Sequence, residues 1–165
     1  MIGGKAALAA GALLGLSVGL SFVHPWGNVR DTARDGETLG GANVPANVRA
    51  ILETKCANCH SNRTRWPSYS RLAPASWLME HDVYAARNVM NLSRWNEMSA
   101  DEQAAALTRM AAEARSGQMP PRPYALMHPS ARLSAEQKRA LIAWARAERT
   151  RIRMMDAQPK GAEHP

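Results

Sequence analysis

The sequence predicts an all-α protein, and three observations support that class. Its apolar residues are mainly Ala, Leu and Met, with 9 Met, a single Phe and only 5% aromatic residues. Apolar residues recur at three- and four-residue spacings, and no alternating stretch is long enough for a strand. Two capping boxes, Ser99 with Glu102 and Ser134 with Gln137, predict where two helices begin. The 165 residues suffice for one domain with short appendages.

Residues 1–25 are predicted to be a signal sequence or a transmembrane anchor. An uncharged run from Ala6 to Val23 follows Lys5. At the rise of an α-helix it would span about 27 Å, close to the thickness of the bilayer hydrocarbon. Trp26 follows where an interfacial aromatic residue would anchor the chain. An uncleaved anchor in the bacterial inner membrane is favoured over a cleaved signal, and either would deliver the remaining chain to the periplasm.

The predicted domain occupies residues 44–150. Residues 26–43, rich in Gly and Asp, indicate a linker or a loosely wrapped arm before it. The first helix is expected to begin at Pro45, with Asn43 as its cap, and to run into the two cysteines.

Later elements are predicted from local signals. A loop is expected over 61–73, a helix from Pro74 towards Met90, and another that ends before Gly117. The four prolines of residues 118–132 exclude a regular helix there. Residues 151–165 indicate a basic, disordered tail after the last helix.

The formal net charge is +7, from 21 Lys and Arg against 14 Asp and Glu. A positive surface favours acidic partner proteins or anionic membranes. Nucleic acid is not expected, because the chain has no Lys/Arg run and no zinc-finger or RNA-binding signature. Steering of acidic partners is expected from the basic residues of the last helix, which are Lys138, Arg139, Arg146, Arg149, Arg151 and Arg153.

Both cysteines lie in one pentapeptide, Cys56-Ala57-Asn58-Cys59-His60, which has the C-x-x-C-H spacing of c-type haem attachment. Thiols about one helical turn apart can reach the two vinyl groups on one edge of a haem. The adjacent imidazole of His60 would then ligate the iron. The sequence therefore predicts one haem c per chain, attached covalently through Cys56 and Cys59.

Four other roles for the pentapeptide are less favoured. A thioredoxin-like redox motif expects a preceding strand, and a zinc site needs paired ligands, whereas the other histidines are scattered. A structural disulfide leaves His60 without a role, and buried free thiols would be unusual in an exported chain.

Met119 is predicted to be the second iron ligand. It lies in Gly117-Gln118-Met119-Pro120-Pro121, where two prolines fix the backbone and the absence of helix lets the thioether point inward. A His/Met pair raises the reduction potential relative to two histidines, which suits electron transfer. His128 is the main competing ligand, and His81 is expected at the surface.

The loop after the pentapeptide carries Arg63, Arg65, Trp66 and Tyr69. One interpretation is that its Arg and Trp donors pair with the haem propionates. The other is that Trp66 packs while the arginines face water. A shift of the midpoint potential on replacing Arg65 by Leu would distinguish them.

Residues 44–145 resemble the bacterial haem-binding domain family, single-haem relatives of the cytochromes c. The matching stretches, in order, are ILETKCANCHSNRTRWPSYS, LAPASWL, NLSRW, the GQMPP turn, LMHPSARLSAEQ and LIAWA. The resemblance implies a cytochrome c-like fold in a periplasmic or membrane-tethered protein. It implies haem attachment at Cys56 and Cys59, with His60 as iron ligand, and it supports Met119. Ser68 stands where similar chains often carry an aromatic residue, so one wall of the pocket is expected to be more open.

Electron transfer between periplasmic or respiratory redox proteins is the favoured function, and the protein is not expected to be an enzyme. The first alternative is a haem protein with an open sixth iron position, acting as a peroxidase or as a gas or redox sensor. The second is a membrane-anchored interaction module in which Cys56 and Cys59 form a disulfide.

Overall fold

A computed structural model describes residues 2–30, 32 and 38–158, and no strand is present among them. This confirms the predicted all-α class. Short π or 3₁₀ turns lie at Leu52–Cys56, Ser68–Arg71, Leu92–Glu97 and Pro129–Ala131. The α-helices are α1 (Ile2–Leu20), α2 (Ala46–Ile51), α3 (Ala57–His60), α4 (Ala75–Val89), α5 (Ala100–Ser116), α6 (Arg122–Met127) and α7 (Ala135–Asp156).

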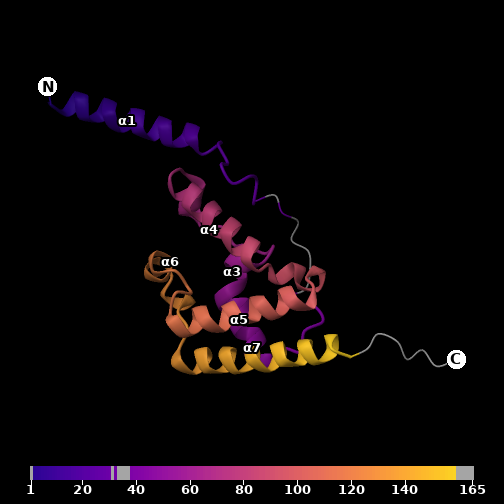
Figure 1. Ribbon diagram of the computed structural model, residues 1–165. Helices are drawn as coiled ribbons and strands as arrows, with labels where there is room; N and C mark the ends of the chain where they lie inside the picture. The colour runs from indigo at the N-terminus through magenta and orange to yellow at the C-terminus, as the bar shows by residue number, and fades with distance from the viewer. Residues whose placement is uncertain (1, 31, 33–37, 159–165) are drawn as a thin grey trace.

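The predicted N-terminal hydrophobic helix is present as α1, which projects away from the other helices (Figure 1). Its leucines are exposed, including Leu8 and Leu13. Among the described residues, no helix combines the length and the apolar character needed to cross a bilayer. The transmembrane anchor that the sequence predicted is therefore not found in the structure. Glycine recurs along the helix, at Gly4, Gly11, Gly15 and Gly19, and contributes no apolar side chain.

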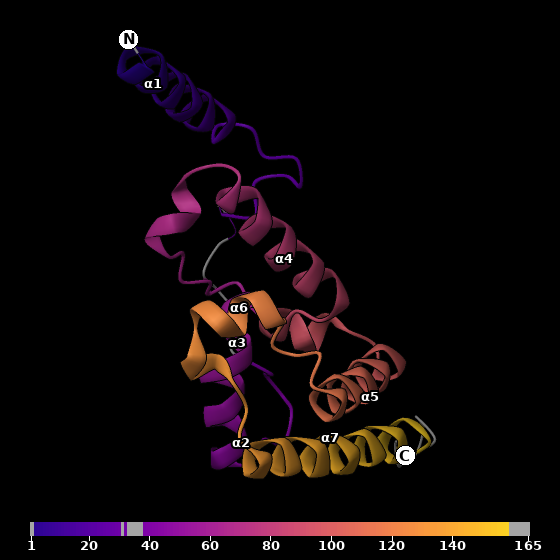
Figure 2. The same cartoon turned by 90° about the vertical axis from the view of Figure 1, so that its left-hand side faces the viewer.

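The hydrophobic core lies around α5 and α7, which pack side by side in both views of the ribbon (Figures 1 and 2). The buried face of α5 is mostly alanine, and small side chains let two helices approach closely. Larger side chains, Leu107 from α5 and Leu141 and Trp144 from α7, fill the contact. The start of the domain adds Leu52, which is fully buried.

Both predicted capping boxes are confirmed. Ser99 at the start of α5 and Ser134 at the start of α7 accept hydrogen bonds from the backbone three residues on, and the reciprocal bonds are present. Gly117 ends α5 in the left-handed conformation, with φ of 74°. Glycine adopts this conformation without a steric penalty, as the sequence predicted for this position.

The predicted cap of the first helix is wrong. Pro45 is the residue before α2 rather than its first residue, and no side chain caps the helix. Asn43 is used instead to hold the chain against α7. Its backbone N–H donates to Glu148 Oε1 at 3.2 Å, and its carbonyl accepts from Trp144 Nε1 at 2.8 Å.

Two further boundaries differ from prediction. The proline-rich segment does contain a short helix, α6, because Pro121 lies just before it and Pro123 lies in its first turn. No intrahelical donor is needed in a first turn, so proline is tolerated there. α7 continues to Asp156, so the predicted tail is helical over 151–156. Residues 159–165 lie outside the described residues.

The described parts of the predicted linker, 26–43, lie against the domain. Thr38 and Leu39 are buried, and the N–H of Leu39 donates to the carbonyl of Leu92 at 2.8 Å. Within the linker, residues 31 and 33–37 lie outside the described residues. Of the two predicted alternatives, these contacts favour a segment that wraps against the domain over a free linker.

Candidate functional site

A cavity of about 480 Å³ lies between α3, α4, α5 and the loop that precedes α6. All four predicted site residues line it: Cys56, Cys59, His60 and Met119. Most of the other lining side chains are apolar, including Met79, Val89, Met90, Met110, Leu133 and Leu141. The structure therefore brings together, around one apolar space, residues that lie far apart in the sequence.

The two cysteines are presented by a continuous helical path through α2, the π turn Leu52–Cys56 and α3. A single π turn inside a helix is frequent at functional sites. Neither Cys56 nor Cys59 forms a disulfide. The alternative in which these cysteines bond to each other therefore has no support in the structure.

Both thiols are held in their neutral form. Burial, strengthened by the neighbouring Cys59, raises the pKa of Cys56 to about 12. Burial, strengthened by the negative charge of Asp82, raises the pKa of Cys59 to about 11. The thiolate is the form that is oxidised and alkylated, so these cysteines are protected from both reactions at neutral pH.

We expect haem-free protein to react slowly with iodoacetamide at pH 8. A pKa near 11 leaves roughly a hundredfold less thiolate than the ordinary value of 9.0, because each unit of pKa is tenfold. The rate of alkylation, followed by mass spectrometry, should keep rising with pH up to about 11. Denatured chain provides the control and should react fast. Equal rates for folded and denatured chain at pH 8 would contradict this result.

His60 has one ring nitrogen engaged and the other available. Its Nδ1–H donates to the carbonyl oxygen of Met90, just beyond the end of α4, at 3.1 Å. Such a bond to a backbone carbonyl orients the imidazole and leaves the lone pair of Nε2 for a metal. Burial lowers the pKa of His60, so the ring is neutral and able to coordinate at neutral pH.

The segment after His60 is fixed by polar contacts with the turn that follows α4. The N–H of Asn62 donates to Ser93 Oγ at 3.1 Å, and Asn91 Nδ2 donates to Asn62 Oδ1 at 2.8 Å. The stretch Asn91–Trp95 resembles the family in sequence, although the sequence alone indicates no role for it. The structure indicates that it supports the backbone beside His60.

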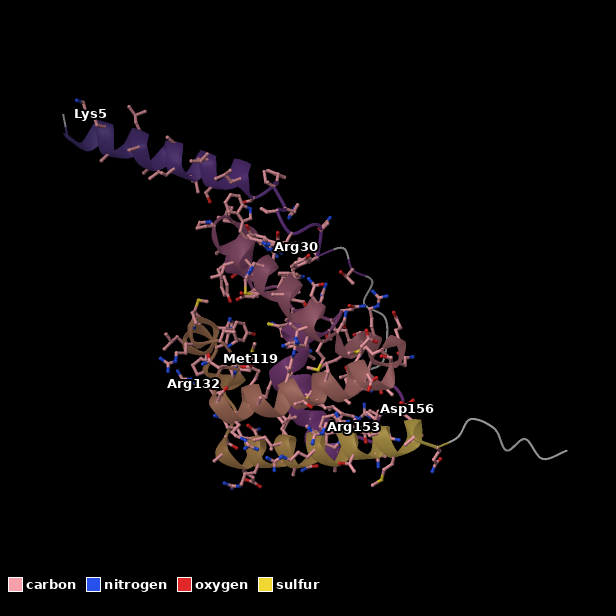
Figure 3. The ribbon with its side chains drawn as sticks, viewed as in Figure 1. Lys5, Arg30, Met119, Arg132, Arg153 and Asp156 are labelled. Carbon is pink, nitrogen blue, oxygen red and sulfur yellow. The ribbon has the colours of Figure 1, made fainter. Side chains whose placement is uncertain are left out.

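Met119 lies on the loop between α5 and α6, as Figure 3 shows, whereas His60 comes from α3. Its side chain lines the cavity and is 39% exposed. Three further thioethers, those of Met79, Met90 and Met110, line the cavity and are buried. Their helical spacing suggested core packing only, so the sequence did not identify them as cavity residues.

His128, the predicted competitor of Met119, is not among the described residues that line the cavity. Its Nε2 lies 2.6 Å from the hydroxyl of Tyr69, and its ring centroid lies 4.4 Å from that of Tyr124. These contacts hold His128 between two tyrosines. His81 has a half-exposed side chain, as expected for a surface residue.

The loop residues proposed to reach the haem propionates do not line the cavity. Arg63 and Arg65 are exposed, and Trp66 lies under the guanidinium of Arg30, 4.1 Å from the ring centroid. Ser68 is exposed and lies outside the described lining of the cavity, so its small side chain does not open a wall there. The arrangement favours the interpretation in which Trp66 packs and the arginines face water.

Two other cations line the cavity, Lys55 on the path into the cysteines and Arg109 on α5. No sequence motif identifies either of them as a site residue. Lys55 adjoins the pentapeptide, and Arg109 follows the spacing of the cavity-lining face of α5, so a helical projection of α5 would have placed it there.

Comparison with protein families matches residues 15–147 to the haem-binding domain family. No curated protein and no solved structure matches the chain. The matched range covers most of the 165 residues and contains every residue named above as lining the cavity. The chain therefore belongs to the haem-binding domain family and is a haem-binding protein.

Proposed function

We propose that the protein is a monohaem c-type cytochrome that carries single electrons and catalyses no bond chemistry. The observation that carries this proposal is the convergence of Cys56, Cys59, His60 and Met119 on one cavity. A haem bound there supplies a one-electron iron couple, and the protein sets its potential through the axial ligands and burial.

The residues present fit a covalently bound haem. The cavity volume of about 480 Å³ lies within the range of cofactor sites, about 300 to 1,000 Å³, and the lining is mostly apolar. Cys56 and Cys59 would each add their thiol across one vinyl group, the sulfur bonding one carbon and the proton the other. This addition neither consumes nor releases electrons. It requires free thiols, and both cysteines are free.

The iron would be held by His60 Nε2 and the sulfur of Met119, with one haem per chain. His60 Nδ1 is already bonded to the Met90 carbonyl, so only Nε2 is left to coordinate. The thioether of Met119 comes from a separate loop, which lets it approach from another wall of the cavity. This ligand pair favours the reduced iron more than two histidines do.

We propose the periplasm as the site of action. The N-terminal segment combines one early lysine with a run rich in Ala, Gly and Leu, which is typical of an export signal.

We propose acidic redox proteins as partners, and a groove between α5 and α7 supports this. The groove has a volume of about 440 Å³ and an apolar floor that includes Leu107 and Ala145. Arg115, Arg146 and Arg149 line it, and no acidic side chain is among the described residues of its lining. A carboxylate-rich surface would complement this charge.

We expect the Arg115→Glu/Arg146→Glu double variant to react more slowly with an anionic oxidant. Stopped-flow oxidation of the reduced protein by ferricyanide should slow severalfold at low salt, because electrostatic steering is weakened. The difference should shrink as salt is added, since charges more than about 10 Å apart are screened at 0.1 M. Arg63→Glu/Arg71→Glu, a pair of exposed sites outside the groove, is the control. An equal loss in both pairs would argue against the groove.

Absorption spectroscopy with a redox titration tests the function directly. We expect a low-spin haem, a weak Met-to-iron charge-transfer band in the oxidised protein, and a one-electron Nernst curve. A high-spin spectrum that changes on addition of CO or peroxide would contradict the proposal.

The same measurement tests a second function, a peroxidase or gas sensor with an open sixth position. The observation that favours it is the 39% exposure of Met119, since a side chain at the edge of the cavity can be displaced by a small ligand.

A further inference from the structure

The chain between α1 and α2 is fastened to α4 by buried charge. We call its described residues 24–30 and 32 the arm. The carboxylate of Glu80 on α4 is buried, accepts from Arg30 Nε at 2.7 Å and lies 3.0 Å from His24 Nδ1. Arg30 also donates to the carbonyl of Ser70. Figure 3 labels Arg30 where the chain that leaves α1 reaches α4.

Arg87, two turns further along α4, fastens the arm a second time. Its Nη1 donates to the carbonyl of Val29 at 2.9 Å and to the hydroxyl of Thr32 at 2.8 Å. The other two guanidinium nitrogens, Nε and Nη2, bind a different segment, the one that follows His60. Nε donates to the carbonyl of Ser61 at 3.0 Å, and Nη2 donates to the hydroxyl of Thr64 at 3.1 Å.

One guanidinium thus joins the arm to the segment that directly follows His60. Arginine suits this position because its planar fork carries five donors in fixed directions, whereas a lysine ammonium donates from a single point. The side chain is partly buried, so these four acceptors replace water around the charge. Ser61, one of them, is the residue bonded to His60 in the chain.

We propose that Arg87 is a positioning residue for His60, and that docking of the arm on α4 thereby adjusts the reduction potential of the haem iron. The inference rests on the proposed ligation of iron by His60. Holding Ser61 in place keeps the imidazole directed so that its Nδ1–H meets the Met90 carbonyl at 3.1 Å. That bond makes the imidazole a more basic ligand, which favours oxidised iron.

The Arg87→Lys variant tests positioning separately from charge. It keeps the positive charge and loses the four-point geometry, so we expect the oxidised form to be favoured less. Changing an outer-shell partner of a metal ligand typically alters metal affinity by about tenfold or more. We expect the same factor in the preference of the site for oxidised over reduced iron. A tenfold change in the equilibrium constant for electron exchange is about 59 mV upward in midpoint potential for one electron. If Arg87 acted through charge alone, the potential of this variant would stay at the wild-type value.

Two further variants test the connection on each side. Thr64→Val removes one acceptor of Arg87 in the segment that follows His60, without changing charge, and should also raise the potential. Arg30→Gln releases the other attachment of the arm and should raise the potential in the wild-type chain. In the Arg87→Lys background it should add nothing further. Such non-additivity is the signature of residues that act through one connection.

Spectroelectrochemistry of the haem-loaded full chain gives the potentials, and proton NMR of the His60 ring resonances reports its orientation. Arg63→Lys, an exposed site in the same segment, is the matched control and should leave both unchanged. Equilibrium constants for electron exchange that stay within twofold of the wild-type value in both Arg87→Lys and Thr64→Val would overturn the inference. If Arg87→Lys does not fold, Thr64→Val and Arg30→Gln decide.

Haem staining of each variant on a denaturing gel separates this inference from the proposed function. Wild-type chain without covalent haem would overturn both. If every variant carries covalent haem while its midpoint potential and His60 resonances are unchanged, the inference is overturned and the proposed function is not.

Discussion

Replacing both Cys56 and Cys59 by serine is expected to abolish the retention of haem after denaturation, whereas the wild-type chain keeps its haem. A hydroxyl does not add to a vinyl group under conditions in which a thiol does, so no covalent bond to the cofactor forms. Either single replacement should leave one thioether and therefore retain haem. Peroxidase staining of a denaturing gel, with the stain normalised to protein, measures the effect.

Loss of covalent haem should also lower the free energy of unfolding of the domain. A domain of roughly 110 residues buries limited apolar surface, and the cavity of about 480 Å³ would lie empty between α4 and α5. Thr54→Ser, at an exposed site just before the cysteines, is the control and should behave like wild type. Staining of the double variant at the wild-type level would exclude thioether attachment through these two residues.

Met119→Leu is expected to convert the low-spin haem to a high-spin form that binds CO. Leucine matches methionine in volume but offers no lone pair, so the sixth position would be vacated with little change in packing. The midpoint potential should fall by roughly 0.1 V, a modest part of the ≈0.8 V range that axial ligands control. Visible spectra with and without CO, together with a redox titration, measure both effects.

Met127→Leu makes the same chemical change at an exposed side chain outside the described lining of the cavity and should change neither property. An unchanged low-spin spectrum in Met119→Leu would show that another side chain ligates the iron. The buried thioethers Met79, Met90 and Met110 would then be the candidates, because they line the same cavity.

The features that sequence alone predicted correctly are those encoded by neighbouring residues. A capping box needs only Ser99 and a glutamate three residues later, and a left-handed helix end needs only Gly117. The C-x-x-C-H spacing is equally local, and the structure places its three side chains on one cavity. Their covalent use stays a prediction.

The features that the sequence did not reveal depend on segments that meet only in the folded chain. Asn43 has the chemistry of a helix cap, yet its backbone is hydrogen-bonded to Glu148 and Trp144 on α7, about a hundred residues later in the sequence. The methionines of α4 and α5 have the same spacing whether they face a core or a cofactor. Arg87 looks like a solvated helix residue until the arm folds back onto it.

The proline-rich segment shows a different limit. The four prolines of residues 118–132 predict that no helix forms there, yet proline is unfavourable only in a helix interior and is tolerated in a first turn. Pro121 lies just before α6 and Pro123 lies in its first turn, so both prolines occupy tolerated positions. Position within the element decides the outcome, and that position is unknown until the start of the helix is known.

The most direct measurement is the intact mass of the mature polypeptide, purified after export from cells with a working haem-attachment system and denatured before analysis. The account predicts a mass that exceeds that of the polypeptide by one haem. A mass equal to that of the polypeptide alone would contradict it, because Cys56 and Cys59 would then carry no cofactor.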